Sequence, residues 1–293
     1  MKRFRGALPA IITPMKGDEV DLDALGSMVE WLLSETCDGI VACGTTGEGA
    51  TLTHEETLAV VRRAKDVVKD RVPLIAGTGS NVTRATVELT RKVAEAGADA
   101  ALVVTPYYNK PTSEGLFRHY EAVAKGGGLP ILMYNVPGRT ALSMDLETIV
   151  RCAGIEGVVG IKDASKDMAL AVRLRERCGS GFALLSGDDF TILPFLACGG
   201  DGVITVVGNV APRDTSELVR AWEGGATEAA RQLQGKLLPL AEALFAETSP
   251  VPLKAALQIM GRCEGSIRMP LTPASDSTRK MLEEVMSAYG GLI

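Results

Sequence analysis

One lysine, Lys162, ends a short apolar run of strand type at residues 158–161. A buried strand rarely carries an unpaired lysine, because removing the ammonium from water is costly. Taken alone, the residue has a simple interpretation: the strand ends there and the side chain reaches solvent. If the side chain is buried, its amine can act as a nucleophile, because burial favours the neutral form that condenses with a carbonyl to give a Schiff base.

Hydroxyl-bearing and amide residues, with one arginine, follow the other apolar runs of the chain. They include Thr13, Thr45, Thr46, Thr78, Thr105, Tyr107, Tyr108, Tyr134, Asn135, Arg139, Thr140, Ser186 and Asn209. A tyrosine beside an iminium can shuttle protons, and threonine hydroxyls with backbone N–H groups can hold the carboxylate of a 2-keto acid. No histidine and no trio of carboxylates stands at these positions, so metal-assisted chemistry is disfavoured and no metal site is expected. These residue types predict carbon–carbon bond chemistry on a keto acid through a lysine Schiff base, without a cofactor.

Other interpretations of single residues stay open at this point. Tyr107 and Tyr108 could be ordinary strand aromatics, the glycine–threonine stretch a plain turn, and Arg139 a surface charge. Asp188 and Asp189 could suggest a metal ligand pair or a general base. Since no third ligand is apparent, we interpret the two aspartates as structural, for example as a cap for the following helix.

The elements that must position these residues alternate along the chain. The expected strands are residues 7–13, 39–43, 73–77, 100–104, 131–134, 158–161, 182–185 and 202–207. Their near-continuous apolar character is typical of parallel strands covered on both faces. Helical patterns separate them, and residues 53–56 have the form of a capping box. Eight such units predict a (β/α)8 TIM barrel, in which the C-terminal ends of the strands build the active site. A doubly wound open sheet is the alternative, although no G-x-G-x-x-G motif follows the first strand.

The alternation stops after the eighth unit. From about residue 226, helical patterns cover residues 229–246, 253–260 and 277–289, with prolines between them. No low-complexity linker precedes them. The sequence therefore predicts a catalytic barrel over residues 1–225 and a helical appendage over residues 226–293 that packs on it.

Charge and composition exclude several classes of partner. The chain has 293 residues, a net charge of −5 and 4% aromatic residues, with both signs of charge mixed throughout. Nucleic acid and anionic membrane surfaces are therefore not expected partners. No run approaches the roughly 20 apolar residues that span a bilayer. The basic residues 1–5 lead directly into a strand without a signal-peptide core, so we expect a cytoplasmic protein.

The cysteines give no sign of a metal or disulfide framework. Six are present without a C-x-x-C pair, and the chain has only two histidines. We expect buried, reduced thiols rather than a zinc site or disulfides.

Three strand-end motifs carry a resemblance to a known family. They are Gly44-Thr45-Thr46-Gly47-Glu48, Tyr134-Asn135-Val136-Pro137-Gly138-Arg139-Thr140 and Gly160-Ile161-Lys162-Asp163. With them the chain resembles the dihydrodipicolinate synthases, also called 4-hydroxy-tetrahydrodipicolinate synthases, of the pyruvate-dependent class I aldolase superfamily. The resemblance covers essentially the whole chain. It implies condensation of pyruvate with L-aspartate 4-semialdehyde to 4-hydroxy-tetrahydrodipicolinate, in the diaminopimelate route of lysine biosynthesis.

The resemblance also implies roles for the catalytic residues. Lys162 would form the Schiff base with pyruvate, and Tyr134 would donate and accept the proton near the iminium. Thr45 and Tyr108 would complete a hydroxyl relay with Tyr134. In this family the equivalent of Tyr108 comes from the neighbouring subunit of a tight dimer, and two dimers usually form a homotetramer, although dimers also occur.

The remaining roles concern substrate binding. Thr46 would bind the pyruvate carboxylate, the backbone of Ile204 would lie beside the substrate, and Gly187 would leave room near the lysine. Arg139 would hold the carboxylate of aspartate 4-semialdehyde through a charge-assisted fork. Sugar-acid lyases of the superfamily usually read Gly-Ser-Thr-Gly-Glu and lack this arginine, so the match favours the synthases. A non-catalytic keto-acid-binding protein on the same scaffold is another alternative, but loss of Lys162 or Tyr134 would be expected of it.

A regulatory site is a further implication of the resemblance, because some members are inhibited by lysine at the dimer interface. The residues that match such a site are Ala50, His54, Asn81 and Tyr107. Thr57 and Ala85 stand where sensitive members commonly have His and Glu, and Gly49 replaces a Ser. Without the Glu the effector's ammonium loses a partner, so we expect weak or absent inhibition by lysine.

Overall fold

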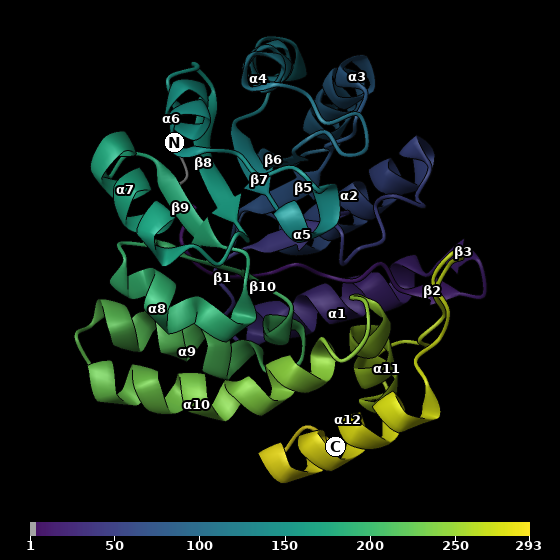
Figure 1. Cartoon of the computed structure of the whole chain (residues 1–293). Coiled ribbons are helices and arrows are strands. Elements are labelled where there is room, and N and C mark those ends of the chain that lie inside the picture. The colour runs from purple at the N-terminus through teal and green to yellow at the C-terminus, as the bar shows by residue number, and fades with distance from the viewer. Residues whose placement is uncertain (1–3) are drawn as a thin grey trace.

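The computed structural model describes residues 4–293, and within them eight parallel strands form a barrel (Figure 1). The strands are β1 (Gly6–Pro9), β4 (Ile40–Ala42), β5 (Leu74–Gly77), β6 (Ala100–Val104), β7 (Ile131–Asn135), β8 (Val158–Asp163), β9 (Ala183–Ser186) and β10 (Gly202–Thr205). From β4 to β10 each strand pairs with the next in chain order, and β10 pairs with β1. A bridge between Ala10 and Val41 closes the circle. The prediction of a (β/α)8 barrel is confirmed, and the doubly wound alternative is wrong.

Helices surround the strands and connect them (Figure 1). They are α1 (Leu22–Ser34), α2 (His54–Val68), α3 (Thr83–Glu95), α4 (Ser113–Gly127), α5 (Pro137–Thr140), α6 (Leu146–Ala153), α7 (Met168–Cys178), η1 (Asp189–Thr191), α8 (Ile192–Ala197), η2 (Val207–Asn209) and α9 (Pro212–Glu223). The predicted capping box at the start of α2 is present, because Thr53 and Glu56 each accept a hydrogen bond from the other's backbone N–H. A small hairpin of β2 (Met15–Lys16) and β3 (Glu19–Val20), which the sequence did not suggest, follows β1.

Both faces of the barrel strands are buried, which explains their continuous apolar runs. One face fills the barrel interior with a cluster that includes Leu8, Leu132, Tyr134 and Ile204. The other face packs against the helices in two larger clusters. Tyr134 therefore points into the barrel rather than toward the helical shell.

The C-terminal appendage consists of α10 (Thr227–Leu244), α11 (Val251–Ile259) and α12 (Asp276–Tyr289), each beginning one or two residues before its predicted start. Figure 1 shows α10 alongside α9, with α12 beyond it. Leu240, Leu253 and Leu282 belong to the same buried cluster as the barrel strands β1 and β4. The appendage thus shares the core of the barrel.

Two further findings concern composition-based expectations. None of the helices in residues 4–293 is both long and apolar enough to cross a membrane. All six cysteines are free, as predicted. Cys37, Cys43 and Cys152 are buried, but the other three are half-buried, so the prediction that the thiols are buried is wrong for those three. The first three residues of the basic N-terminal stretch lie outside the described part of the chain.

Candidate active site

Lys162 and Tyr134 are partners in the register of two adjacent strands. The pairing of β7 with β8 sets Tyr134 opposite Lys162. Each residue is 7% exposed, and the Lys162 ammonium lies 4.3 Å from the centre of the Tyr134 ring. The interpretation that the strand ends at Lys162 and its side chain reaches water is therefore wrong. The lysine is a buried amine against a phenol ring.

The turn between β4 and α2, residues 44–51, carries Thr45 and Thr46. We call it the threonine turn. The Glu48 N–H donates to the Thr45 carbonyl at 3.1 Å, and the Gly49 N–H donates to the Gly44 carbonyl at 3.0 Å. Glu48 has a φ of +55°, a left-handed conformation that is uncommon for a residue with a side chain. The turn is thus a compact structure, in which Thr46 is buried and Thr45 is exposed.

A cavity of about 480 Å³ opens at the C-terminal ends of the strands. Its lining combines the threonine turn, the ends of several strands and part of the appendage. The predicted site residues that line it are Thr45, Ala50, His54, Tyr107, Tyr134 and Arg139. Lys162 is not one of the lining residues, but it lies against Tyr134, and Tyr134 lines the cavity. The cavity is where a small keto acid can meet these side chains.

Arg139 reaches the cavity from α5, the short helix that follows β7. Its Nη2 donates to the carbonyl of Ser249 at 3.1 Å, directly before the appendage helix α11. One hydrogen bond leaves other guanidinium donors available for a carboxylate. Arg139 is therefore a residue of the cavity wall rather than a surface charge alone.

Gly187 follows β9, the strand beside β8, and Ile204 lies in β10, on the other side of β9. Ile204 is buried in the barrel interior and pairs with Leu8 across β10 and β1. Gly187 follows β9, and a Cβ placed on it would lie 2.9 Å from the Lys162 Cε and 2.9 Å from the Ala164 Cβ. A side chain at position 187 would therefore crowd the lysine.

Tyr108 is separated from the cavity of its own chain. Its side chain is 90% exposed and its φ is +69°, whereas the adjacent Tyr107 lines the cavity. Across residues 4–293, no hydrogen bond joins the hydroxyls of Tyr108, Tyr134 and Thr45. Asn81 also lies outside the lining, and its carbonyl accepts a hydrogen bond from Asn109 at 2.9 Å. One chain brings together Thr45 and Tyr134 but not Tyr108.

The chain is similar to known proteins over nearly its whole length. A model of the Dihydrodipicolinate synthetase family matches residues 3–289. The chain belongs to this family. It is 49% identical to the 4-hydroxy-tetrahydrodipicolinate synthase of Syntrophus aciditrophicus over 290 residues, which cover 98% of this chain and 99% of that protein.

Solved structures of the dihydrodipicolinate synthetase family have the same fold. Dihydrodipicolinate synthase from Aquifex aeolicus is 42% identical, with a TM-score of 0.97 and coverage of 99% of both chains. The chloride-inhibited enzyme from Acinetobacter baumannii in complex with pyruvate is 43% identical, with a TM-score of 0.96 and coverage of 99% of both chains. The family condenses pyruvate with L-aspartate 4-semialdehyde in lysine and diaminopimelate biosynthesis, and this chain is an enzyme of that kind, a class I aldolase-type lyase.

A polar contact that the sequence did not predict lies next to Lys162 and Tyr134. Asn135 and Asp163 come one residue after Tyr134 and Lys162 and are themselves register partners. The Asn135 amide donates to the Asp163 carboxylate at 2.8 Å, and Ser165 donates to its other oxygen at 2.6 Å. Burial raises the pKa of Asp163. The signal was available, because two polar residues follow two adjacent strand ends.

Asp188 and Asp189 are structural, but neither caps a helix as expected. Asp188 precedes η1 without a side-chain bond to its backbone and instead accepts from the Thr191 hydroxyl. Asp189 is buried and accepts from the Thr205 hydroxyl and, at 2.9 Å, from the Val206 N–H. Burial raises the pKa of Asp189 to about 6. Asp189 therefore holds the end of β10, beside Ile204.

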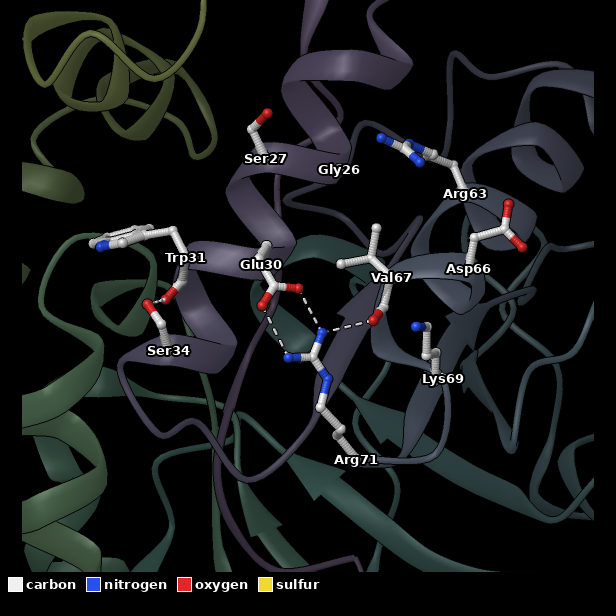
Figure 2. Close-up of a pocket in the computed structure, with 10 residues that line it drawn as sticks. All are labelled: Gly26, Ser27, Glu30, Trp31, Ser34, Arg63, Asp66, Val67, Lys69 and Arg71. Atoms are coloured by element: carbon white, nitrogen blue, oxygen red, sulfur yellow. Dashed lines mark hydrogen bonds and ion pairs between the residues drawn. The ribbon is translucent and has the colours of Figure 1, made fainter.

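A second hollow, of about 640 Å³, lies on the outer surface between α1 and α2 (Figure 2). Arg71 there forms a two-pronged pair with the Glu30 carboxylate and also donates to the Val67 carbonyl. Figure 2 shows the other charged side chains, Arg63, Asp66 and Lys69, along the α2 side of the hollow. This hollow is far from the strand ends and its lining contains none of the predicted site residues.

Proposed function

We propose that Lys162 is the nucleophile of this condensation and Tyr134 its proton donor and acceptor. The observation that carries the proposal is their pairing across β7 and β8, with the ammonium 4.3 Å from the ring centre. The buried Lys162 amine, placed against that ring, is the group that we assign to attack the carbonyl. The phenol beside it is in place to move protons to and from the adduct.

The reaction then follows from the chemistry of the amine. The Lys162 Nζ adds to C2 of pyruvate, and loss of water gives an iminium. The iminium withdraws electrons from C3, which loses a proton to become an enamine. The enamine carbon attacks the aldehyde of L-aspartate 4-semialdehyde and forms the new carbon–carbon bond. The amine of the second substrate then displaces Lys162 as the ring closes, which frees the enzyme.

The substrate contacts are assigned by residue type and position. We assign the pyruvate carboxylate to Thr46 and the backbone of the threonine turn, and the carboxylate of the semialdehyde to Arg139. The close approach of position 187 to the Lys162 side chain supports a spacing role for Gly187. The Ile204 backbone, at the end of β10, is assigned to the side of the bound pyruvate.

A second copy of the chain is part of the proposed site. The 90% exposed Tyr108 cannot complete a relay with Thr45 and Tyr134 inside one chain, so we propose that each subunit of a tight homodimer lends Tyr108 to the other. Two such dimers would form a tetramer. Sedimentation together with Tyr108→Phe kinetics tests this: a fully active monomer would contradict it.

Lysine is proposed to inhibit this enzyme weakly or not at all. Ala50, His54 and Tyr107 line the cavity, as a lysine site would require, together with Thr57 and Ala85. Neither of the last two can pair with an ammonium as a carboxylate does. An inhibition constant in the range of lysine-sensitive family members would overturn this proposal.

Location and domain limits complete the proposal. Mixed charge and the biosynthetic reaction of the family support a cytoplasmic enzyme. We propose residues 1–225 as the catalytic barrel and 226–293 as the appendage, since β10 and α9 precede this boundary and α10 follows it.

The deciding experiment is reductive trapping. Borohydride with pyruvate should add mass to the native protein at Lys162, and Lys162→Ala should show neither trapping nor turnover. In parallel, the native enzyme should condense pyruvate with aspartate semialdehyde and should not cleave sialic acid. Trapping at another residue, or activity only with the sugar acid, would refute the assignment.

A further inference from the structure

Two buried charges, Glu48 and Lys254, connect the active-site mouth with the appendage. Glu48 belongs to the threonine turn and Lys254 to α11. Their side chains are 2% and 1% exposed, and the Lys254 ammonium forms an ion pair with the Glu48 Oε1. Charges removed from water in this way require good geometry and full hydrogen bonding, so the position of each side chain constrains the other.

The remaining polar contacts of the pair come from the loop after α11. The Lys254 ammonium donates to the Ser266 carbonyl at 2.6 Å. The Glu48 Oε2 accepts from the Arg268 N–H at 3.0 Å. Glu48 is therefore held by two separate segments of the appendage, the helix α11 and the loop around residues 266–268.

The backbone of Glu48 transmits this constraint to the threonine turn. Its N–H donates to the Thr45 carbonyl at 3.1 Å, and its carbonyl accepts from the Thr51 N–H at 2.9 Å and the Thr51 hydroxyl at 3.0 Å. Because Glu48 also adopts the left-handed conformation, the turn depends on how its side chain is held. A change at Lys254 would therefore be felt at Thr45 and Thr46.

The same part of the appendage reaches the cavity at a second point. Thr248, Ser249 and Pro250 line the cavity directly before α11, and the Ser249 carbonyl accepts from Arg139. The appendage thus contacts both the threonine turn and the arginine of the opposite wall. Its placement on the barrel sets the shape of the mouth from two sides.

We propose that Lys254, acting through Glu48, is a positioning residue for Thr45 and Thr46, which makes the C-terminal appendage part of the catalytic apparatus. The proposal rests on the roles assigned above to those two threonines. A displaced turn weakens the grip on the pyruvate carboxylate and misaligns the proton relay. A misplacement of about 1 Å in such a site can reduce turnover about a hundredfold.

The plain alternative is that the pair only stabilises the fold, and three variants separate the two roles. Lys254→Met leaves the Glu48 charge buried without its cation, so it should lower Tm strongly. Glu48→Gln keeps an acceptor for the Arg268 N–H but loses the charge. The double variant Glu48→Gln/Lys254→Met removes both charges, so its Tm should recover toward the native value, because no charge is left unpaired. The double variant still lacks the ion pair that joins the threonine turn to α11.

Arg175 and Asp201 provide a matched control away from the mouth. Their ion pair of 2.6 Å is largely buried, and Asp201 also accepts from the Leu184 N–H. Asp201 directly precedes β10, so the pair lies at the N-terminal ends of the strands, opposite the cavity. Arg175→Met should lower Tm without raising the KM for pyruvate.

The readouts are Tm, kcat, the KM for each substrate and borohydride trapping at saturating pyruvate. We expect the double variant to keep trapping at Lys162, to raise the KM for pyruvate about tenfold and to lower kcat about 10- to 100-fold despite its recovered Tm. Native kinetic constants in the double variant would overturn the proposal, and so would an equal KM increase in Arg175→Met. Absence of trapping in the native protein would instead refute the role of Lys162, so the two failures are distinct.

Discussion

Asn135 and Asp163 are joined by a hydrogen bond of 2.8 Å one residue beyond the register partners Tyr134 and Lys162. Because successive side chains of a strand point to opposite faces, this contact ties β7 to β8 on the face away from the barrel interior. Asn135 also accepts from the Met144 N–H at 3.1 Å. The contact fixes the register that holds the phenol over the ammonium.

Asp163→Ala should therefore weaken both fold and activity. The change leaves the buried Asn135 amide without its acceptor, and such a group costs about 1–3 kcal/mol of unfolding free energy. We expect a loss of about 2 kcal/mol in urea unfolding, with reduced kcat because the register is looser. Ser165→Ala, which removes the second donor to Asp163 and an exposed acceptor for the Asp167 N–H, is the milder control. If Asp163→Ala were as stable as the native protein, the contact between Asn135 and Asp163 would not contribute to the free energy of unfolding.

Tyr134→Phe separates Schiff-base formation from proton transfer. The ring that faces Lys162 is retained, so trapping of pyruvate at Lys162 should persist. The hydroxyl is lost, so kcat should fall by about 10²- to 10⁴-fold, the usual contribution of a positioned acid–base group. Steady-state kinetics and mass spectrometry after borohydride provide the two readouts. Turnover close to that of the native enzyme would remove Tyr134 from the proton path.

Gly187→Ala tests the space beside Lys162, the proposed nucleophile. The added methyl would lie 2.9 Å from the Lys162 Cε and from the Ala164 Cβ, so the lysine side chain must move. We expect trapping to slow by about tenfold or more through this displacement. Gly181→Ala is the matched control, because nothing lies within 4 Å of a Cβ at that position. Equal rates in the two variants would contradict a spacing role.

Patterns along the chain predicted the barrel, because its strands follow from local periodicity. Apolar runs identify the strands, and the strand-end position brings Lys162, Tyr134 and Thr45 to one mouth. The capping box of α2 was predictable for the same reason, since Thr53 and Glu56 meet within one helical turn.

Contacts between distant segments were not predictable in this way. In the sequence, Lys254 has the features of an ordinary helical residue. Its pairing with Glu48 depends on how the appendage packs against the cavity at the strand ends. The exposure of Tyr108 likewise depends on the tertiary course of its loop. Asp188 was misjudged because its hydroxyl and lysine partners, Thr191 and Lys166, are set by side-chain geometry after folding.

Arg268, in the loop that holds Glu48, also contacts Glu56, and this contact makes the free energy of unfolding depend on pH. The Arg268 guanidinium contacts both carboxylate oxygens of Glu56, at 2.5 and 2.9 Å, and holds the pKa of Glu56 at about 2, below its ordinary value of 4.5. A carboxyl with a lowered folded-state pKa releases its proton more readily in the folded state. Its contribution is complete above about pH 4.5 and is lost as the pH falls toward 2.

We expect this contribution to be about 2 kcal/mol, because partial exposure of the pair weakens it. Glu56→Gln should therefore unfold more easily in urea at pH 6, whereas the difference from the native protein should shrink toward pH 2.5. Asp189, whose burial raises its pKa to about 6, acts in the opposite direction, but it is common to both proteins and cancels in the difference. Glu55→Gln, on the exposed side of the same turn, should leave the pH profile unchanged. A constant difference between native and Glu56→Gln proteins from pH 6 to 2.5 would show that Arg268 does not hold the carboxylate ionised.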